Sequence, residues 1–235
     1  MKTLVKNGTI VTSTNEFAAD ILIEDEKISM IASHIDVEAD TVIDAAGKYV
    51  LLGGVDNHSH FEALNTDGVT TNAGYDTTWV ALKGGTTTIV DFCTNEPGMD
   101  MMESLEYRLN VRSKGKLAPD MAIHAVCTDF RGEETLDEIP KLVEAGVPTM
   151  KLFLAYKPTP LYMDDYKYLR FLERASQVGM TMMVHAENPD VLDYERNKMA
   201  EAGCLDPKYH YMTRPPYGEA EAVARSIKFA DAMDI

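Results

Sequence analysis

The chain has 235 residues, of which 45% are apolar, and its 38 acidic against 22 basic side chains give a net charge of −16. Such an acidic surface repels nucleic-acid phosphates and anionic lipid head groups, so neither a nucleic acid nor a membrane is an expected partner, and no run approaches the ~18 apolar residues of a membrane span. Three widely spaced cysteines without a CxxC pair, and an N-terminus that lacks an unbroken apolar stretch, favour a cytoplasmic protein over a secreted one.

The first fifty residues predict a β-rich unit. Segments 4–12, 19–33 and 41–51 are rich in β-branched residues, and turn signals such as Asn7-Gly8 interrupt them. From residue 51 the pattern changes, so we place a domain boundary there.

Short apolar runs and amphipathic segments alternate along the rest of the chain. Five apolar runs begin near residues 50, 86, 121, 149 and 181, about one βα unit apart. Helical patterns occupy 75–84, 101–114, 133–146, 164–179, 188–203 and 217–233. Nearly continuous apolar strands indicate burial on both faces, and therefore a parallel sheet covered by helices in an α/β fold.

Two architectures fit this alternation, a (β/α)8 barrel and an open doubly wound sheet. No GxGxxG segment follows an early strand, which argues against a Rossmann dinucleotide site. The polar residues in or at the C-terminal ends of the predicted strands are His58, His60, Asp91, Lys151 and His185. A barrel keeps its chemistry at that end, so we predict a (β/α)8 TIM-type barrel whose first five βα units lie within 51–235.

The sharpest candidate site is the segment Val55–His60, which contains an HxH pair. Residues two apart in a strand point the same way, so His58 and His60 present two imidazoles on one face. Together they could bind one divalent metal. Ordinary hydrogen bonding at a strand end is the alternative.

A lysine and a further histidine follow on later strands. Lys151 interrupts an apolar run, where a charged amine costs several kcal/mol unless it is neutral, paired or modified. A neutral amine could form a Schiff base or a carbamate, whereas at a sheet edge it could simply reach water. His185 ends the next strand, as either a ligand or a hydrogen-bonded core residue.

The remaining histidines and cysteines have weaker signals. His124 lies within a strand, and we expect it to point to the core or to a packing helix. His34 and His210 have no evident partner. We interpret Cys93 and Cys127 as small core residues.

Several motifs resemble those of one enzyme family. Gly53–His60 resembles the first-strand motif of the amidohydrolase superfamily. The motifs similar to its hydantoinase and dihydropyrimidinase branch are Gly84–Thr88 with Asp91-Phe92, Met150–Lys157, Val184–Asn188, and Tyr211–Pro216 with Glu219–Ala222. The resemblance covers the whole chain and corresponds to the N-terminal half of the family.

The resemblance implies a site with two divalent metal ions, zinc being expected, in a (β/α)8 barrel, with 1–50 as the N-terminal part of a β-sandwich domain. The implied metal ligands are His58 and His60 on the more buried ion, carbamylated Lys151 between the two, and His185 on the more exposed ion. A metal-bridging hydroxide would attack a ring amide, and the substrate-binding Tyr156 would donate to the developing oxyanion. The expected function is hydrolysis of cyclic amides or ureides, as in pyrimidine catabolism, by a homo-oligomer that is tetrameric at full length.

Two departures and three alternatives accompany this resemblance. The family's sixth-strand His and eighth-strand Asp would fall beyond Ile235, so we expect a barrel truncated before its sixth strand and inactive alone. Segment Phe61–Asp67 differs from the usual loop, which affects substrate range. Glu62 stands where the similar dihydroorotases place an Arg for the substrate carboxylate, which argues against an anionic substrate. The alternatives are a catalytically incomplete fragment, a non-catalytic dihydropyrimidinase-related structural or interaction protein, and an allantoinase.

Overall fold

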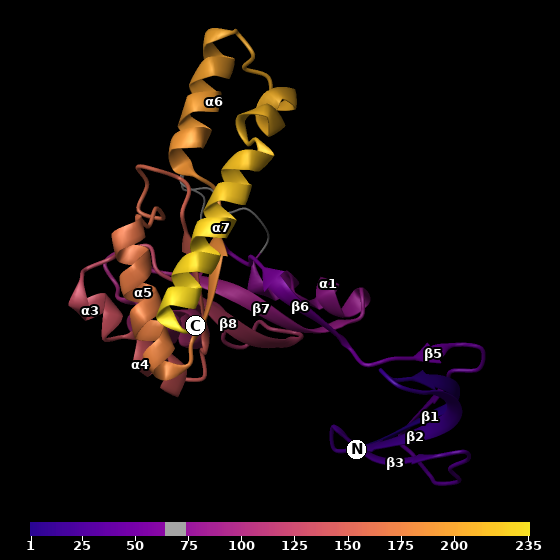
Figure 1. Cartoon of the computed structure of the whole chain (residues 1–235). Helices are drawn as coiled ribbons and strands as arrows, with labels where there is room; N and C mark the ends of the chain where they lie inside the picture. The colour runs from indigo at the N-terminus through magenta and orange to yellow at the C-terminus, as the bar shows by residue number, and fades with distance from the viewer. Residues whose placement is uncertain (64–73) are drawn as a thin grey trace. The chain divides into compact units, whose positions relative to one another are not determined.

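The computed structural model describes residues 1–63 and 74–235 and contains two compact units, Met1–Gly54 and Val55–Ile235 (Figure 1). Each unit has its own sheet. Within the described residues, no helix combines the length and apolar character needed to cross a membrane.

The N-terminal unit is a five-stranded sheet. Its strands are β1 (Lys2–Val11), β2 (Glu16–Glu24), β3 (Lys27–Ala32), β4 (Thr41–Asp44) and β5 (Tyr49–Val50). Their order is β3-β2-β1-β4, with β5 also on β1. The first three strands are antiparallel neighbours, whereas β4 and β5 run parallel to β1. Asp25 and Glu26, both at positive φ, make the tight turn between β2 and β3.

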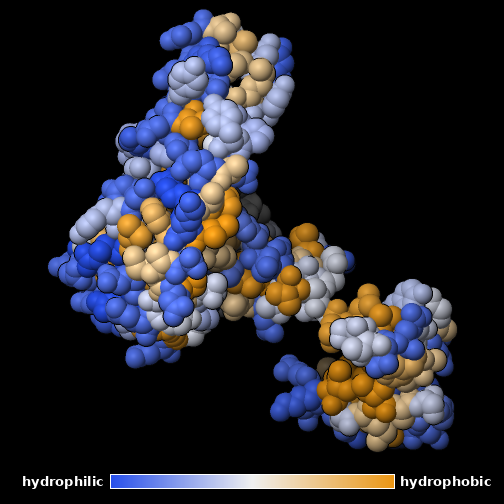
Figure 2. All heavy atoms as spheres, in the orientation of Figure 1, coloured by the Kyte–Doolittle hydropathy of each residue, from blue (hydrophilic) through white to orange (hydrophobic). Residues whose placement is uncertain are grey.

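Both faces of this sheet bury apolar side chains. Leu22 belongs to one small cluster and its neighbour Ile21 to another, since successive residues of a strand face opposite ways. Large apolar side chains also remain exposed on β3 and β4, among them Ile28, Met30 and Val42. Apolar residues accordingly cover much of this unit's visible surface in Figure 2.

The second unit is built on a curled parallel half-barrel sheet. Its strands are β6 (Gly54–Ser59), β7 (Thr86–Thr94), β8 (Asp120–Val126), β9 (Thr149–Phe153) and β10 (Thr181–His185). They pair in sequential order from β6 to β10. A doubly wound sheet reverses its strand order partway across, so this order excludes the open-sheet alternative for the described strands.

Helices connect and cover the strands. The α-helices are α1 (Trp79–Lys83), α2 (Met101–Tyr107), α3 (Glu133–Leu136), α4 (Ile139–Glu144), α5 (Asp165–Val178), α6 (Pro189–Glu201) and α7 (Pro216–Met233). The other helical segments are the 3-10 helices η1 (Tyr75–Thr77) and η3 (Pro207–Thr213) and the π-helical turn η2 (Arg108–Arg112). In Figure 1, α6 and the start of α7 extend beyond the strands of this unit.

Three predicted helices are broken. The segment 75–84 divides into η1 and α1. The segment 101–114 changes from α to π geometry at Arg108. The segment 133–146 divides into α3 and α4, because Pro140 lacks a backbone N–H and is accommodated in the first turn of the second helix.

The main core lies between the half-barrel sheet and its helices. Met150 and Leu152 of β9 are fully buried there, together with Phe171 of α5. Helix α5 begins where the side chain of Asp164 accepts a hydrogen bond from the Lys167 N–H. Because Met150 and Leu152 face the helices, Lys151 between them must face the other side of the sheet.

Candidate functional site

Four of the five predicted strand-end residues gather on the sheet face that the helices do not cover, and Asp91 is the exception. In the parallel register, Phe92 lies beside His124 and Phe153 lies beside His185. Lys151 pairs with Val126, which lies two residues after His124 on β8. Lys151 therefore lies on the same face of the sheet as His124. We call this surface the site face.

The two histidines of β6 meet on one aromatic ring of the site face. The ring centroids of His58 and His60 are 5.2 Å apart, and they lie 4.7 and 4.8 Å from that of Phe92. Burial lowers the pKa of both imidazoles, and the nearby Lys151 lowers both further. Both rings are therefore biased toward the neutral form, which has a lone pair free for a metal.

Lys151 is buried, and the part of the chain that the structure describes offers it no anionic partner. Only 9% of its surface is exposed, and its Nζ lies 4.8 Å from the ring centroid of Phe92 and 5.1 Å from that of Phe153. Among residues 1–63 and 74–235, no carboxylate lies within ion-pair distance of this nitrogen. Burial lowers the pKa of the amine. The low exposure disagrees with an amine that reaches freely into water.

A second group of polar side chains surrounds His185. Its Nε2 lies 2.5 Å from Oε2 of Glu187, and the same oxygen accepts from Nη1 of Arg214 at 2.5 Å. Burial alone would raise the pKa of Glu187, but the hydrogen bonds from His185 and Arg214 outweigh it and leave this pKa lowered. The hydroxyl of Tyr156 lies 3.4 Å from Nε2 of His185. Glu187 and Arg214 therefore orient the imidazole that stands beside Tyr156.

The ring of Phe153 separates these two groups. It stacks on His185 with centroids 5.7 Å apart and packs under Lys151. Tyr156, three residues later, has a φ of 69°, a left-handed conformation that is uncommon for a tyrosine and concentrates at functional sites. The backbone thus turns sharply where it brings the phenol back toward the site face.

The donor set accommodates a divalent metal only if the lysine is modified. No cluster of three or more His, Cys, Asp and Glu side chains suited to a metal occurs within the described ranges. His58 and His60 supply two imidazole donors, whereas metal sites of this kind use three or four protein donors. A carbamate on the Lys151 amine would add the missing carboxylate-like oxygens, so the residues fit a metal under that condition.

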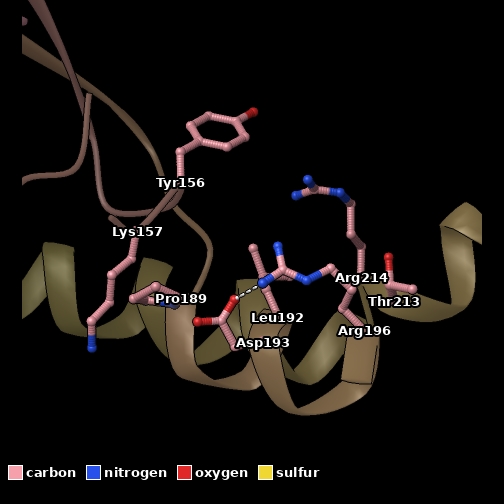
Figure 3. A pocket seen from close by; sticks show the side chains of 8 residues that line it. All are labelled: Tyr156, Lys157, Pro189, Leu192, Asp193, Arg196, Thr213 and Arg214. Carbon is pink, nitrogen blue, oxygen red and sulfur yellow. Dashed lines mark hydrogen bonds and ion pairs between the residues drawn. The ribbon is translucent and has the colours of Figure 1, made fainter. Parts of the chain in front are cut away.

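A small cavity lies next to Tyr156 (Figure 3). Its volume is about 60 Å³, and it is lined by Tyr156, Lys157, Pro189, Leu192, Asp193, Arg196, Thr213 and Arg214. Ligand pockets for drug-sized molecules are typically several hundred Å³ in volume. This cavity is therefore too small to enclose a drug-sized ligand.

Two residues lie on the opposite side from the one expected. His124 faces the site, where its Nδ1 lies 2.6 Å from Oγ1 of Thr149 and its Nε2 lies 3.1 Å from the carbonyl of Asn57. Asp91 faces away from the site, fully buried, and Oδ2 accepts from the hydroxyl of Tyr75. The alternation of side chains along a strand predicts which residues share a face of the sheet, but it does not predict which of the two faces the helices cover.

Sequence reasoning also missed residues that shape the site. The rings of Phe92 and Phe153 contact the polar groups of the site, and the position of Phe153 two residues after Lys151 in one strand was the available signal. Tyr75 and Arg108 join Asp91 behind the sheet, which no local pattern indicated. Residues 64–67 of the divergent segment Phe61–Asp67 lie outside the described residues.

A half-barrel with imidazoles, an amine and a phenol on its open face has the organisation of an α/β enzyme fold. No family model matches the chain. It is 40% identical to the D-hydantoinase of Geobacillus stearothermophilus over 98% of this chain and 49% of that protein. It is 35% identical to the dihydropyrimidinase of Dictyostelium discoideum over 98% of this chain and 46% of that protein.

Solved structures of proteins with the same names are also similar to this chain. The crystal structure of a D-hydantoinase matches with a TM-score of 0.91 and 38% identity, covering 99% of this chain and 50% of that one. The dihydropyrimidinase from Brevibacillus agri matches with a TM-score of 0.91 and 37% identity, covering 100% and 50%. The chain is therefore similar along its whole length to D-hydantoinases and dihydropyrimidinases, and it spans about half the length of the relatives it matches.

Proposed function

We propose that the protein is a metal-dependent hydrolase that opens cyclic amides or ureides, such as hydantoin or dihydropyrimidine rings. The observation that carries this proposal is the buried Lys151, which has no anionic partner among the described residues. Its amine lies over the ring of Phe92, which also contacts His58 and His60. The similarity to the relatives above supports the same chemistry, since they are named hydantoinases and dihydropyrimidinases.

The proposed cofactor is a pair of divalent cations, zinc being the expected identity. The ligands in this proposal are His58, His60, the carbamate of Lys151, and His185. The carbamate would form when the neutral amine attacks CO₂ and loses one proton, which converts a buried base into an anion that two cations can share. When bound, the cations would acidify a water molecule sufficiently for it to act as a nucleophile near neutral pH.

The remaining side chains would bind and orient the substrate. Tyr156 would donate a hydrogen bond to the ring carbonyl oxygen as negative charge develops there. The rings of Phe92 and Phe153 offer an apolar surface for the body of a flat heterocycle. Glu62 already pairs with Arg112, Nε to Oε2 at 3.0 Å, so this position offers no free cation for an anionic substrate.

The wider architecture follows as part of this proposal. The half-barrel would belong to a (β/α)8 barrel whose first five βα units lie in 51–235, with 1–50 in a β-sandwich domain. Closing such a barrel requires strands that the described residues do not contain, and the relatives' double length is consistent with this. We further propose a homo-oligomer in the cytoplasm, where free Cys93, Cys127 and Cys204 would stay reduced. The comparisons favour neither a non-catalytic structural role nor an allantoinase.

The test is a ring-opening assay on the native gene product that contains these residues. Dihydrouracil and 5-phenylhydantoin serve as substrates, before and after removal of metal by a chelator. We expect metal-dependent turnover that Lys151→Ala abolishes, whereas Lys141→Ala, at an exposed lysine of α4, retains it. Absence of turnover on both rings, or turnover unchanged in Lys151→Ala, would overturn the proposal.

A further inference from the structure

Three polar side chains are buried together behind the half-barrel sheet. Tyr75 and Asp91 are 0% exposed and Arg108 is 1% exposed. The hydroxyl of Tyr75 donates to Oδ2 of Asp91 at 2.5 Å and accepts from Nη1 of Arg108 at 2.8 Å. Nη1 of Arg108 also lies 3.6 Å from Oδ2 of Asp91.

Stability alone does not account for this buried network. Burial raises the pKa of the Asp91 carboxyl and of the Tyr75 phenol, so Arg108 does not fully compensate for the lost hydration. Apolar replacements of buried ion pairs are often neutral or stabilising. The contacts that the network makes elsewhere therefore bear on its role.

The network ends on the backbone that follows the HxH pair. The N–H of Phe61, next to His60, donates to Oδ1 of Asp91 at 3.0 Å. The carbonyl of Phe61 accepts from Nη1 of Arg108 at 3.1 Å. Oδ1 of Asp91 also accepts from the N–H of Phe92, at 3.0 Å. One carboxylate oxygen thus ties the end of β6 to the residue whose ring lies beside both histidines.

The next residue is held as well. The carbonyl of Glu62 accepts from Nη2 of Arg112, and its Oε1 accepts from the N–H of Tyr75, both at 3.3 Å. Glu62 has a φ of 50°, which costs about 1 kcal/mol or more for a residue other than glycine and persists where surrounding contacts enforce it. Arg108 and Arg112 both lie on η2, and π-helical turns occur often at functional sites.

We propose that Tyr75, Asp91 and Arg108 are positioning residues that hold the end of β6 so that His58 and His60 converge on one metal ion. The inference rests on the proposed metal site. Groups that orient metal ligands typically affect metal affinity by about 10–100-fold. Here the orientation acts through the backbone of Phe61 and not through the imidazoles themselves.

Tyr75→Phe is the sharpest variant, since it deletes only the hydroxyl that joins Asp91 to Arg108. The affinity of the native gene product for Zn²⁺ is measured by competition with a chromophoric chelator. The melting temperature of the metal-free protein is measured by thermal unfolding. We expect Zn²⁺ affinity to fall about 10–100-fold. The matched control is Tyr168→Phe, which removes a hydroxyl from a tyrosine that is 3% exposed and packs in the helix-side core. We expect it to lower the melting temperature without changing Zn²⁺ affinity.

The imidazole NMR signals of the metal-free protein provide a second readout. We expect Tyr75→Phe to shift or broaden the His60 signal and Tyr168→Phe to leave it unchanged. Wild-type Zn²⁺ binding that both variants retain equally would overturn the positioning role and leave the proposed function intact. If the wild-type protein does not bind Zn²⁺, the proposed metal site is wrong. In that case the positioning role is tested by NMR alone, and a His60 signal that is the same in Tyr75→Phe as in the wild type would reject it.

Discussion

The Nζ of Lys151 lies 4.8 Å from the centre of the Phe92 ring, on the same ring that contacts both histidines of β6. A buried cation gains up to about 2 kcal/mol over an aromatic face. Burying an unpaired ammonium costs several kcal/mol, so the ring offsets only part of this cost. The ring of Phe92 therefore contacts Lys151 and both histidines, in a site that favours a neutral or modified amine.

Replacing both His58 and His60 with alanine should remove the metal. Each imidazole is biased toward its neutral, ligating form, and the described residues offer no alternative cluster of His, Cys, Asp and Glu. Elemental analysis after dialysis should show the loss of at least one metal ion per chain. The control is His34→Ala, at an exposed histidine of the N-terminal unit. Unchanged metal stoichiometry in the double variant would show that the ligands lie elsewhere.

Tyr156→Phe should reduce kcat about 10²–10³-fold, in keeping with the loss of one donor to a developing oxyanion. The melting temperature should change little, because the ring remains. Steady-state kinetics on dihydrouracil would measure this, with Tyr162→Phe as the control at a nearby half-buried tyrosine. A kcat within twofold of wild type would remove Tyr156 from the catalytic groups.

Adjacent residues of β9 should respond oppositely to substitution. Leu152 is 0% exposed in the core, so Leu152→Ala should cost about 2–5 kcal/mol of unfolding free energy. Lys151→Met replaces a desolvated amine with an apolar side chain of similar length, so stability should be retained or increased while turnover disappears. Urea unfolding of the metal-free proteins would compare them. A larger loss of stability in Lys151→Met than in Leu152→Ala would contradict the assigned faces of β9.

Thiol reactivity should depend on both burial and pH. Burial raises the pKa of Cys93 to about 11 and of Cys127 to about 12, whereas Cys204 is half-buried. At pH 8 the two buried thiols should hold ~0.1% thiolate or less, and their alkylation should rise as the pH approaches these values. Among these three cysteines, only Cys204 should react rapidly with Ellman's reagent in the native protein, whereas Cys93 and Cys127 should react rapidly only in denaturant. Cys204→Ser should remove the rapid phase, and a second rapid thiol would contradict the packing.

Sequence patterns predicted the five strands of the second unit and the alternation along β9. A lysine between two apolar residues of one strand must face away from them, so the separate environment of Lys151 was foreseeable. The sheet faces on which Asp91 and His124 lie could not be predicted from the sequence. They depend on the strand register that sets Phe92 beside His124 and on which face of the sheet the helices cover. The contacts of Tyr75 and Arg108 with Asp91 depend on segments far apart in the chain, and local periodicity carries no signal for them.

The most direct test of the central claim is ¹³C NMR of the native gene product loaded with zinc in ¹³C-bicarbonate, combined with anomalous diffraction at the zinc edge. The account predicts a lysine carbamate signal that disappears in Lys151→Ala, and zinc density bounded by His58, His60 and the modified Lys151. A free amine at Lys151 in the zinc-loaded protein, or zinc bound away from these side chains, would contradict it.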